Sequence, residues 1–237
     1  MDETKRSPSA LLLWARNIFL FLPAIGLAWP AVPHFLDGRV WDAAIPVPNS
    51  MIAQIALPKA AYRSAAQALA GASRDDGEAT ILRAEAALRG GAKPGDEISR
   101  LEQGLRHQPA SARGWTLLAD ALAETGQRKK AAAALSLALQ LGPNDYWLAG
   151  MRARAATPLW DDLDADARAS ALAQVRLLWD EPLLHRELRP LLSTPDGVAL
   201  AALAFQGRHD ELRAMNRWLA MDRIRHPDPY RKNGIGP

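Results

Sequence analysis

Residues 112–145 read ARGWTLLADALAETGQRKKAAAALSLALQLGPND, and they divide into two helical patterns around one glycine. Apolar residues recur three or four positions apart on both sides of this glycine, which is the spacing of one face of an α-helix. A glycine between two such patterns favours a tight turn, and a proline after the second pattern marks its end. The positions concerned are Trp115, Leu118, Ala119, Leu122, Gly126, Ala131, Leu135, Ala138 and Pro143. The stretch therefore predicts a helical hairpin whose small residues let the two helices approach closely.

The preceding stretch, residues 78–111, is a degenerate copy of the same length. Pro109 and Pro143 are 34 positions apart, which equals the length of the unit. The segment Lys93–Asp96 predicts the turn between the two helices of this copy. Glu97 stands where the second unit has an alanine. The helical stripes of this unit are Ile81, Ala84, Glu85 and Leu88 in the first helix, and Leu101 and Gly104 in the second.

The hairpin at 112–145 resembles the tetratricopeptide repeat, a helix–turn–helix unit of 34 residues. It departs from the family pattern where Leu122 replaces the usual tyrosine and Leu135 the usual phenylalanine. The resemblance implies an α-solenoid of helical hairpins, whose first helices line a surface that binds a segment of a protein partner. It places six residues on that surface, namely Leu82, Arg89, Arg113, Thr116, Asp120 and Glu124. Their charges are mixed, so the surface does not resemble a basic clamp for a C-terminal carboxylate.

The remainder of residues 59–225 also reads as helical, which predicts one all-α domain. The predicted helices cover 59–70, 146–156 (ended by Pro158), a stretch from Asp162 or Asp164 to Asp180, 182–192, 194–206 and 210–221. Alanine supplies 46 of the 237 residues and favours helix over strand. Five tryptophans (Trp115, Trp147, Trp160, Trp179 and Trp218) fall at or near helical core positions, where we expect them to pack. The tail 226–237 is rich in proline and glycine, and we expect it to be flexible.

The N-terminal part of the chain predicts a membrane anchor. Residues 18–36 read IFLFLPAIGLAWPAVPHFL and contain no charge over a length that can cross a bilayer core. Basic residues precede this run, so the positive-inside tendency places residues 1–17 in the cytoplasm. Residues 37–58 then form a proline-rich linker. Two alternatives stay open for the apolar run, a cleaved signal peptide and a buried core helix.

The sequence contains no motif that indicates catalysis, a metal site or a cofactor. Cysteine is absent, which excludes thiolate chemistry, and the five histidines show no metal-ligand spacing. The acidic cluster at 161–166 lacks the glycine and distal glutamate of a calcium loop, so we expect it to cap a helix. The basic run at 128–130 reads as a solvated face. A formal net charge of +3, with no basic face, argues against a nucleic-acid partner.

These observations predict a non-enzymatic scaffold that is anchored in a bacterial inner membrane by a single span. Its repeat domain would lie in the periplasm and assemble a cell-envelope complex through a protein partner. The high ratio of arginine to lysine suggests a GC-rich bacterial genome. Residues 141–164 are similar to extensions of repeat proteins in exopolysaccharide synthesis and export, which favours that pathway, while cytochrome c maturation and cell division stay open. The main alternative is an accessory subunit of a membrane polysaccharide polymerase or ligase, and a glycan-cleaving enzyme is a third possibility.

Overall fold

The computed structural model describes residues 57–72 and 75–227. Of these residues, 82% are helical and none forms a strand, which confirms the prediction of an all-α chain. The predicted membrane span at 18–36, nearly all of the linker at 37–58, and the end of the tail lie outside the described residues. Within the described residues, each helix is too short or too polar to cross a bilayer.

Ten α-helices follow one another in the described part of the chain. They are α4 (Lys59–Ala68), α5 (Gly77–Arg89), α6 (Pro94–His107), α7 (Ala112–Glu124), α8 (Arg128–Leu141), α9 (Tyr146–Leu159), α10 (Ala165–Asp180), α11 (His185–Leu192), α12 (Pro195–Ala204) and α13 (His209–Arg225). Short 3₁₀ turns at Leu69–Gly71, Trp160–Asp162 and Pro182–Leu184 join some of them.

Side-chain caps fix where the first helix of each of three hairpins begins. The side chains of Asp76, Ser111 and Asp145 accept hydrogen bonds from backbone N–H groups at the starts of α5, α7 and α9. Such a cap satisfies a donor that the helix itself leaves unpaired. The three caps are 35 and 34 positions apart, so the repeat length seen in the sequence extends to a third hairpin. Asp164 caps α10 in the same way, which confirms the capping role expected for the acidic cluster.

Glycines in the left-handed conformation close two of these hairpins. Gly91 has φ 96° between α5 and α6, and Gly126 has φ 80° between α7 and α8. In each turn the following residue donates to a carbonyl five positions back, as in a Schellman motif. The turn predicted at Lys93–Asp96 was wrong, because Pro94 is the first residue of α6 and the turn precedes it. Proline fits there because the first helical residue needs no backbone donor.

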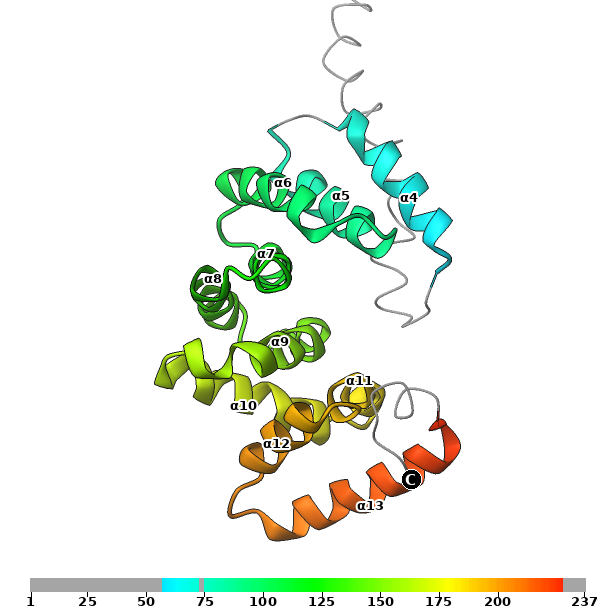
Figure 1. The fold of residues 1–237 in the computed structure, drawn as a ribbon, viewed down its shortest axis with the longest axis vertical. Helices are drawn as coiled ribbons and strands as arrows, with labels where there is room; N and C mark the ends of the chain where they lie inside the picture. Colours follow the sequence, from blue (N-terminus) through cyan, green and yellow to red (C-terminus); the bar gives the residue numbers. More distant parts are fainter. Residues whose placement is uncertain (1–56, 73–74, 228–237) are drawn as a thin grey trace, which may run out of the picture.

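The hairpins stack into a curved column. Figure 1 shows the pairs α5–α6, α7–α8 and α9–α10 following one another, with α4 and α13 at the two ends. The helices α6, α8 and α10 lie along one side, and α5, α7 and α9 along the other. Beyond α10, the helices α11 and α12 pack on α9 and α10. This architecture is consistent with an α-solenoid.

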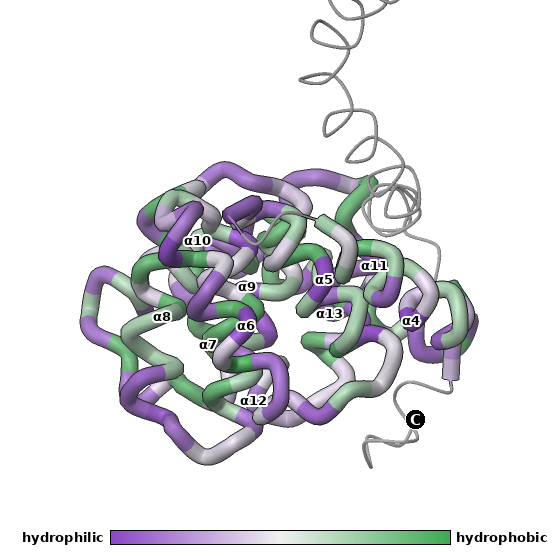
Figure 2. Tube along the Cα trace, turned by 90° about the horizontal axis from the view of Figure 1, so that it is seen from above, coloured by the Kyte–Doolittle hydropathy of each residue, from purple (hydrophilic) through white to green (hydrophobic). Residues whose placement is uncertain are grey.

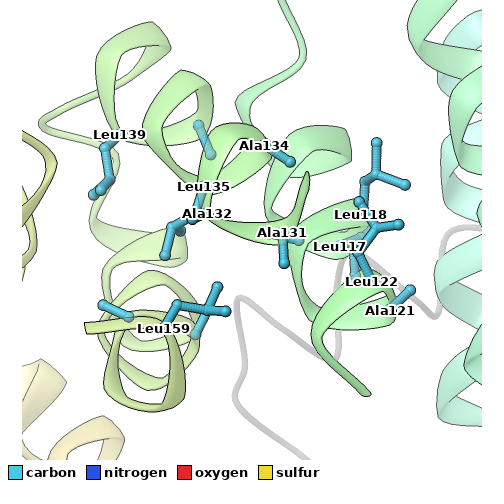
Figure 3. Close-up of a cluster of buried hydrophobic side chains, with 14 of the residues drawn as sticks. Leu117, Leu118, Ala121, Leu122, Ala131, Ala132, Ala134, Leu135, Leu139 and Leu159 are labelled. Atoms are coloured by element: carbon cyan, nitrogen blue, oxygen red, sulfur yellow. The ribbon is translucent and has the colours of Figure 1, made fainter. Parts of the chain in front are cut away.

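Small residues at the predicted positions bring the helices together. Ala119, Ala131, Leu135 and Ala138 are fully buried, and Leu118 and Leu122 are nearly so. Figure 3 shows most of these side chains meeting between α7, α8 and α9. Hydrophobic and hydrophilic residues alternate within single helices (Figure 2), as expected when each helix buries one face. The packing predicted for residues 112–145 is therefore confirmed.

Two buried polar side chains hold the loop that contains Pro143. Arg152 donates from Nη1 to the carbonyl of Gly142, and Gln174 donates from Nε2 to the carbonyl of Pro143 at 2.9 Å. Both side chains are buried, and burial lowers the pKa of the Arg152 guanidinium. Asp145 partly offsets this effect because its negative charge favours the charged arginine. The end of one hairpin is thus fixed to α9 and α10 of the next.

A second hydrophobic cluster fills the C-terminal third of the described chain. Phe205 is fully buried there, and Trp179, Trp160 and Trp218 pack at its edge, as predicted. Trp115 is partly buried against the first cluster and donates from its indole nitrogen to the carbonyl of Pro109 at 2.8 Å. Trp147 was predicted to pack in the core but is 49% exposed. It is the second residue of α9 and lies on the side of this helix that meets solvent.

The helix predicted to stop before Pro158 continues to Leu159. Pro158 lies in the last turn of α9, where its missing backbone donor costs the helix one hydrogen bond. Leu159 is fully buried in the first cluster, and this contact holds the last turn in place. The final helix, predicted as 210–221, also runs further and ends at Arg225.

Candidate functional site

A groove of about 380 Å³ lies where α5, α7 and α9 meet. Its apolar lining consists of Leu88, Leu117, Ala121 and Met151, together with Ala92 and Pro94 beside the first turn. Its charged lining consists of Glu85, Arg89, Asp120, Glu124 and Arg154. The groove therefore combines an apolar surface with acidic and basic groups, as surfaces that bind ligands commonly do.

Three of the charged residues occupy equivalent positions in successive helices. Glu85, Asp120 and Arg154 each lie nine positions after the capping residue of their helix, which is Asp76, Ser111 or Asp145. Equal spacing from equivalent starts places them at the same register on α5, α7 and α9. We call these three residues the charged column. The repeat thus carries one row of charged side chains along the groove.

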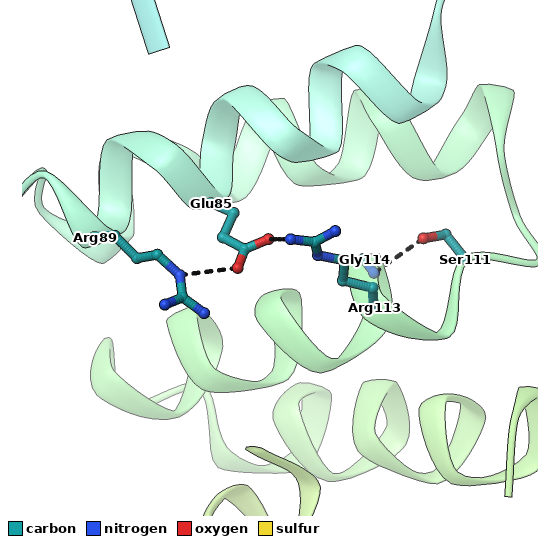
Figure 4. A network of polar contacts seen from close by, with 5 residues as sticks. All are labelled: Glu85, Arg89, Ser111, Arg113 and Gly114. Carbon is teal, nitrogen blue, oxygen red and sulfur yellow. Dashed lines mark hydrogen bonds and ion pairs between the residues drawn. The ribbon is translucent and has the colours of Figure 1, made fainter. Parts of the chain in front are cut away.

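Glu85 is fully buried and has two cationic partners. Arg89 lies one turn further along α5 and donates from Nε to Oε1 of Glu85 at 2.9 Å. Arg113 comes from α7, and its Nη2 lies 2.5 Å from Oε2 of Glu85 (Figure 4). A buried carboxylate is tolerated when cations and hydrogen bonds compensate for lost water. The pair with Arg113 also joins the first hairpin to the second.

Asp120 has a different electrostatic environment. Burial raises the pKa of this carboxyl to about 7, and the neighbouring negative charge of Glu124 adds to the effect. Arg154 opposes the shift because a positive charge favours the ionised acid. Within the described residues, Asp120 and Glu124 accept no hydrogen bond from a side chain and form no ion pair. Asp120 is therefore a shielded carboxyl without a close cation.

Arg154 is directed partly toward α11. Its Nη1 lies 3.6 Å from Oε2 of Glu187, and both side chains are about one-third exposed. Gly150 makes room for this contact, because a Cβ at this position would lie 3.0 Å from the same carboxylate oxygen. The cation of Arg154 is thus shared between Asp120 and Glu187. Arg154 does not form an ion pair with Asp120.

Searches of protein-family models, of curated proteins and of solved structures found no match to this chain. Among the described residues, no group of three or more histidine, aspartate and glutamate side chains gathers as a metal site would require. Asp120 is a carboxyl of the groove with a clearly raised pKa.

Four of the six residues predicted for a partner surface lie at the groove or beside it. Arg89, Asp120 and Glu124 line the groove, and Arg113 pairs with Glu85 next to it. The other two predicted positions are not accessible to a partner.

Leu82 is buried against Leu69 and Ala79, because α4 and the turn after it cover this side of α5. Thr116 is fully buried, and its hydroxyl donates to the carbonyl of Ala112 at 2.8 Å. The partner-surface positions that the resemblance implied for Leu82 and Thr116 are therefore wrong, because neighbouring elements cover Leu82 and Thr116 faces inward.

Arg154 and Met151 line the groove but were not predicted. The signal for Arg154 was present in the sequence, since it lies 34 positions after Asp120 and 34 is the repeat length. The third hairpin keeps few of the apolar signature residues of the second, so the repeat was predicted only for residues 78–145. Met151 carries the same signal, because it lies 34 positions after Leu117, which also lines the groove.

Proposed function

We propose that this chain is a non-catalytic scaffold of the tetratricopeptide-repeat type, which binds a segment of a partner protein in the groove of α5, α7 and α9. The observation that carries the proposal is the charged column of Glu85, Asp120 and Arg154 above an apolar lining. The apolar lining of such a surface can bury side chains of a bound peptide, and its charged groups can fix the orientation of the peptide.

The repeat spacing supports the tetratricopeptide assignment. The caps of the three first helices are separated by 35 and 34 residues, and glycine turns close the first two hairpins. A helix–turn–helix unit of 34 residues is the period of this family. In stacked helical repeats, the first helices together form an extended binding surface, and here α5, α7 and α9 form the groove.

We further propose that residues 18–36 anchor the scaffold in a bacterial inner membrane, with the helical domain in the periplasm. Their uncharged length and the basic residues before them support this part of the proposal. Assembly of an envelope complex, in exopolysaccharide synthesis or export, is the pathway that the sequence favours.

A groove-filling substitution tests the scaffold proposal. Leu88 lines the groove and is partly buried, so Leu88→Trp adds bulk there without changing charge. Leu137 is 41% exposed on α8, and Leu137→Trp is the matched control. In affinity capture of the full chain from detergent-solubilised membranes, we expect Leu88→Trp to lose partners that the wild type and Leu137→Trp retain.

Circular dichroism and thermal unfolding establish that both tryptophan variants keep the helical fold. Equal capture by Leu88→Trp, with the fold intact, would contradict the proposal that the groove binds the partner. Capture of no envelope protein by the wild type would contradict the scaffold proposal as a whole.

The accessory-subunit alternative makes a different prediction about the span. Three prolines interrupt residues 18–36, and membrane helices tolerate prolines best where neighbouring helices satisfy the freed backbone groups. If the chain is such a subunit, replacing 18–36 by an unrelated span removes its partners. If it is a scaffold, the replaced span leaves capture unchanged.

A further inference from the structure

Asp120 and Glu124 form an acidic edge on the groove side of α7. They are four positions apart, so both side chains lie on the same face of the helix. Within the described part of the chain, neither forms an ion pair or accepts a hydrogen bond from a side chain. Glu85, one helix away, has two arginine partners. The acidic edge therefore differs from the other acidic group of the groove in lacking a cation at contact distance.

The surroundings of Asp120 make an added cation favourable. Apolar residues on α7 and α9, namely Leu117, Ala121 and Met151, line the same groove as Asp120, and burial raises the pKa of its carboxyl. An ionised carboxylate in such a place is costly unless a positive charge approaches it. The same apolar surface suits the methylene stem of a lysine or arginine, whose charged head then reaches the acids.

The charges around Asp120 leave a negative excess. The groups that face this part of the groove are Glu85 and Arg89 on α5, Arg113 and Glu124 on α7, Arg154 on α9 and Glu187 on α11. With Asp120 ionised, these are four acids and three bases. A ligand carboxylate or phosphate placed at the acidic edge would add to the repulsion, and an apolar side chain would leave Asp120 uncompensated.

We propose that the groove binds a partner segment that carries a lysine or arginine side chain, and that this cation pairs with Asp120 and Glu124. The inference rests on the proposed binding function and specifies its ligand. The aliphatic part of the side chain lies along Leu117 and Met151, and the charged end lies between the two carboxylates.

Binding should depend on pH in a defined direction. The pKa of Asp120 is about 7 in the unoccupied groove, so most of this carboxyl is ionised at pH 8 and most is protonated at pH 6. A cationic side chain pairs with the ionised form, so affinity should fall as the pH is lowered across this range. The change in the ionised fraction corresponds to roughly a tenfold loss of affinity.

A random peptide library tests the proposal directly. The full chain is immobilised in detergent and selects peptides displayed on phage at pH 8, and the bound peptides are sequenced. We expect lysine and arginine to be enriched at one position, and the affinity of a selected peptide to fall at pH 6.

Two variants and one control assign the effect to the acidic edge. Asp120→Asn and Glu124→Gln together should remove both the basic preference and the pH dependence. Glu102→Gln removes an equivalent charge from an exposed position on α6 and should leave both unchanged.

The outcomes separate this inference from the proposed function. Peptides that bind without a basic residue, and that Leu88→Trp no longer binds, would overturn the inference and leave the binding function intact. A basic preference that survives the double substitution would also overturn it. If no peptide binds at either pH, both the inference and the proposed function fail.

Discussion

At the scale of single residues, close approach and burial decide what each position tolerates. Gly77 and Gly104 lie where α5 crosses α6, and a Cβ on Gly104 would lie 2.7 Å from Cγ1 of Ile81 and 3.1 Å from the carbonyl oxygen of Gly77. Ile81 is fully buried, so its side chain has little room to move. Gly104 is therefore required by contact between two helices, although its helical conformation would suit any residue.

Gly104→Ala should reduce the free energy of unfolding by about 1–3 kcal/mol, because the added methyl group overpacks the crossing. Gly95 is the matched control on the same helix, since a Cβ there would meet only a methyl group of Thr125, at 3.5 Å. We expect Gly95→Ala to be neutral or to stabilise by up to about 1 kcal/mol through helix propensity. Urea unfolding of the two variants measures the difference. Equal effects of the two substitutions would contradict the close approach.

The raised pKa of Asp120 predicts how stability changes with pH. Its folded-state pKa of about 7 lies above the ordinary value of 3.8, so its protonated form favours the folded state. The corresponding stability is present below the ordinary value and is lost as the pH rises through 7. Asp120→Asn removes this loss. We expect it to stabilise the protein more at pH 8 than at pH 5, with a difference on the order of 1–3 kcal/mol.

Thermal or urea unfolding of Asp120→Asn at the two pH values checks this expectation. Glu102→Gln is again the control, because it removes an exposed carboxyl from α6. A pH dependence identical to that of the wild type would show that Asp120 titrates normally in the folded state.

At the scale of elements, the last helix is attached differently from the others. The stacked pairs bury alanine and leucine between closely spaced helices, whereas α13 contacts the rest through Met215, Trp218 and Leu219. It also carries Asp222, whose two carboxylate oxygens each accept a hydrogen bond from Arg189 on α11 at 2.8 Å. Large side chains and one bidentate ion pair therefore hold this helix in place.

Asp222→Asn should loosen α13 selectively. Asp222 is buried, and Asp222→Asn removes the carboxylate that pairs with Arg189, so α13 loses its bidentate ion pair with α11. We expect faster hydrogen exchange across residues 209–225 and little change in α5 to α8. Mass spectrometry of exchanged peptides resolves the two regions. A uniform increase over the whole domain would indicate instead that α13 unfolds together with the repeats.

Matched substitution of both partners provides the control for this experiment. Arg189→Leu combined with Asp222→Leu removes both charges and keeps apolar bulk, so exchange in α13 should return toward that of the wild type. Failure of the double variant to recover any protection would place the cause in helix α13 itself.

At the scale of the whole molecule, the structural features that were predicted correctly are those that depend on residues close together in the sequence. The hairpin at 112–145, its glycine turn and the cap of α10 all follow from local spacing and were predicted correctly. These features need no information about distant segments, because capping and helical periodicity act within a few turns.

The errors concern contacts between elements that spacing does not encode. Leu82 faces α4, a helix outside the recognised repeats, and Thr116 faces inward on α7, so both are buried. Trp147 is exposed because it is out of register with Trp115: the residue 34 positions after Trp115 is Ala149, which is fully buried. The groove lining from α9 was missed for a different reason: Arg154 and Met151 keep the repeat spacing, but the third hairpin lacks most of the apolar signature.

The charged column has a consequence for orientation. At α5 two arginines surround Glu85, so this end of the groove is positive, whereas Asp120 and Glu124 make the acidic edge of α7 negative. At α9 the positive charge of Arg154 is offset by Glu187, so the two ends of the groove differ in charge. An extended peptide has an N-to-C direction. A groove whose two ends differ in charge therefore distinguishes a peptide bound in one direction from the same peptide bound in reverse. The groove should therefore bind a peptide segment in one N-to-C direction in preference to the reverse.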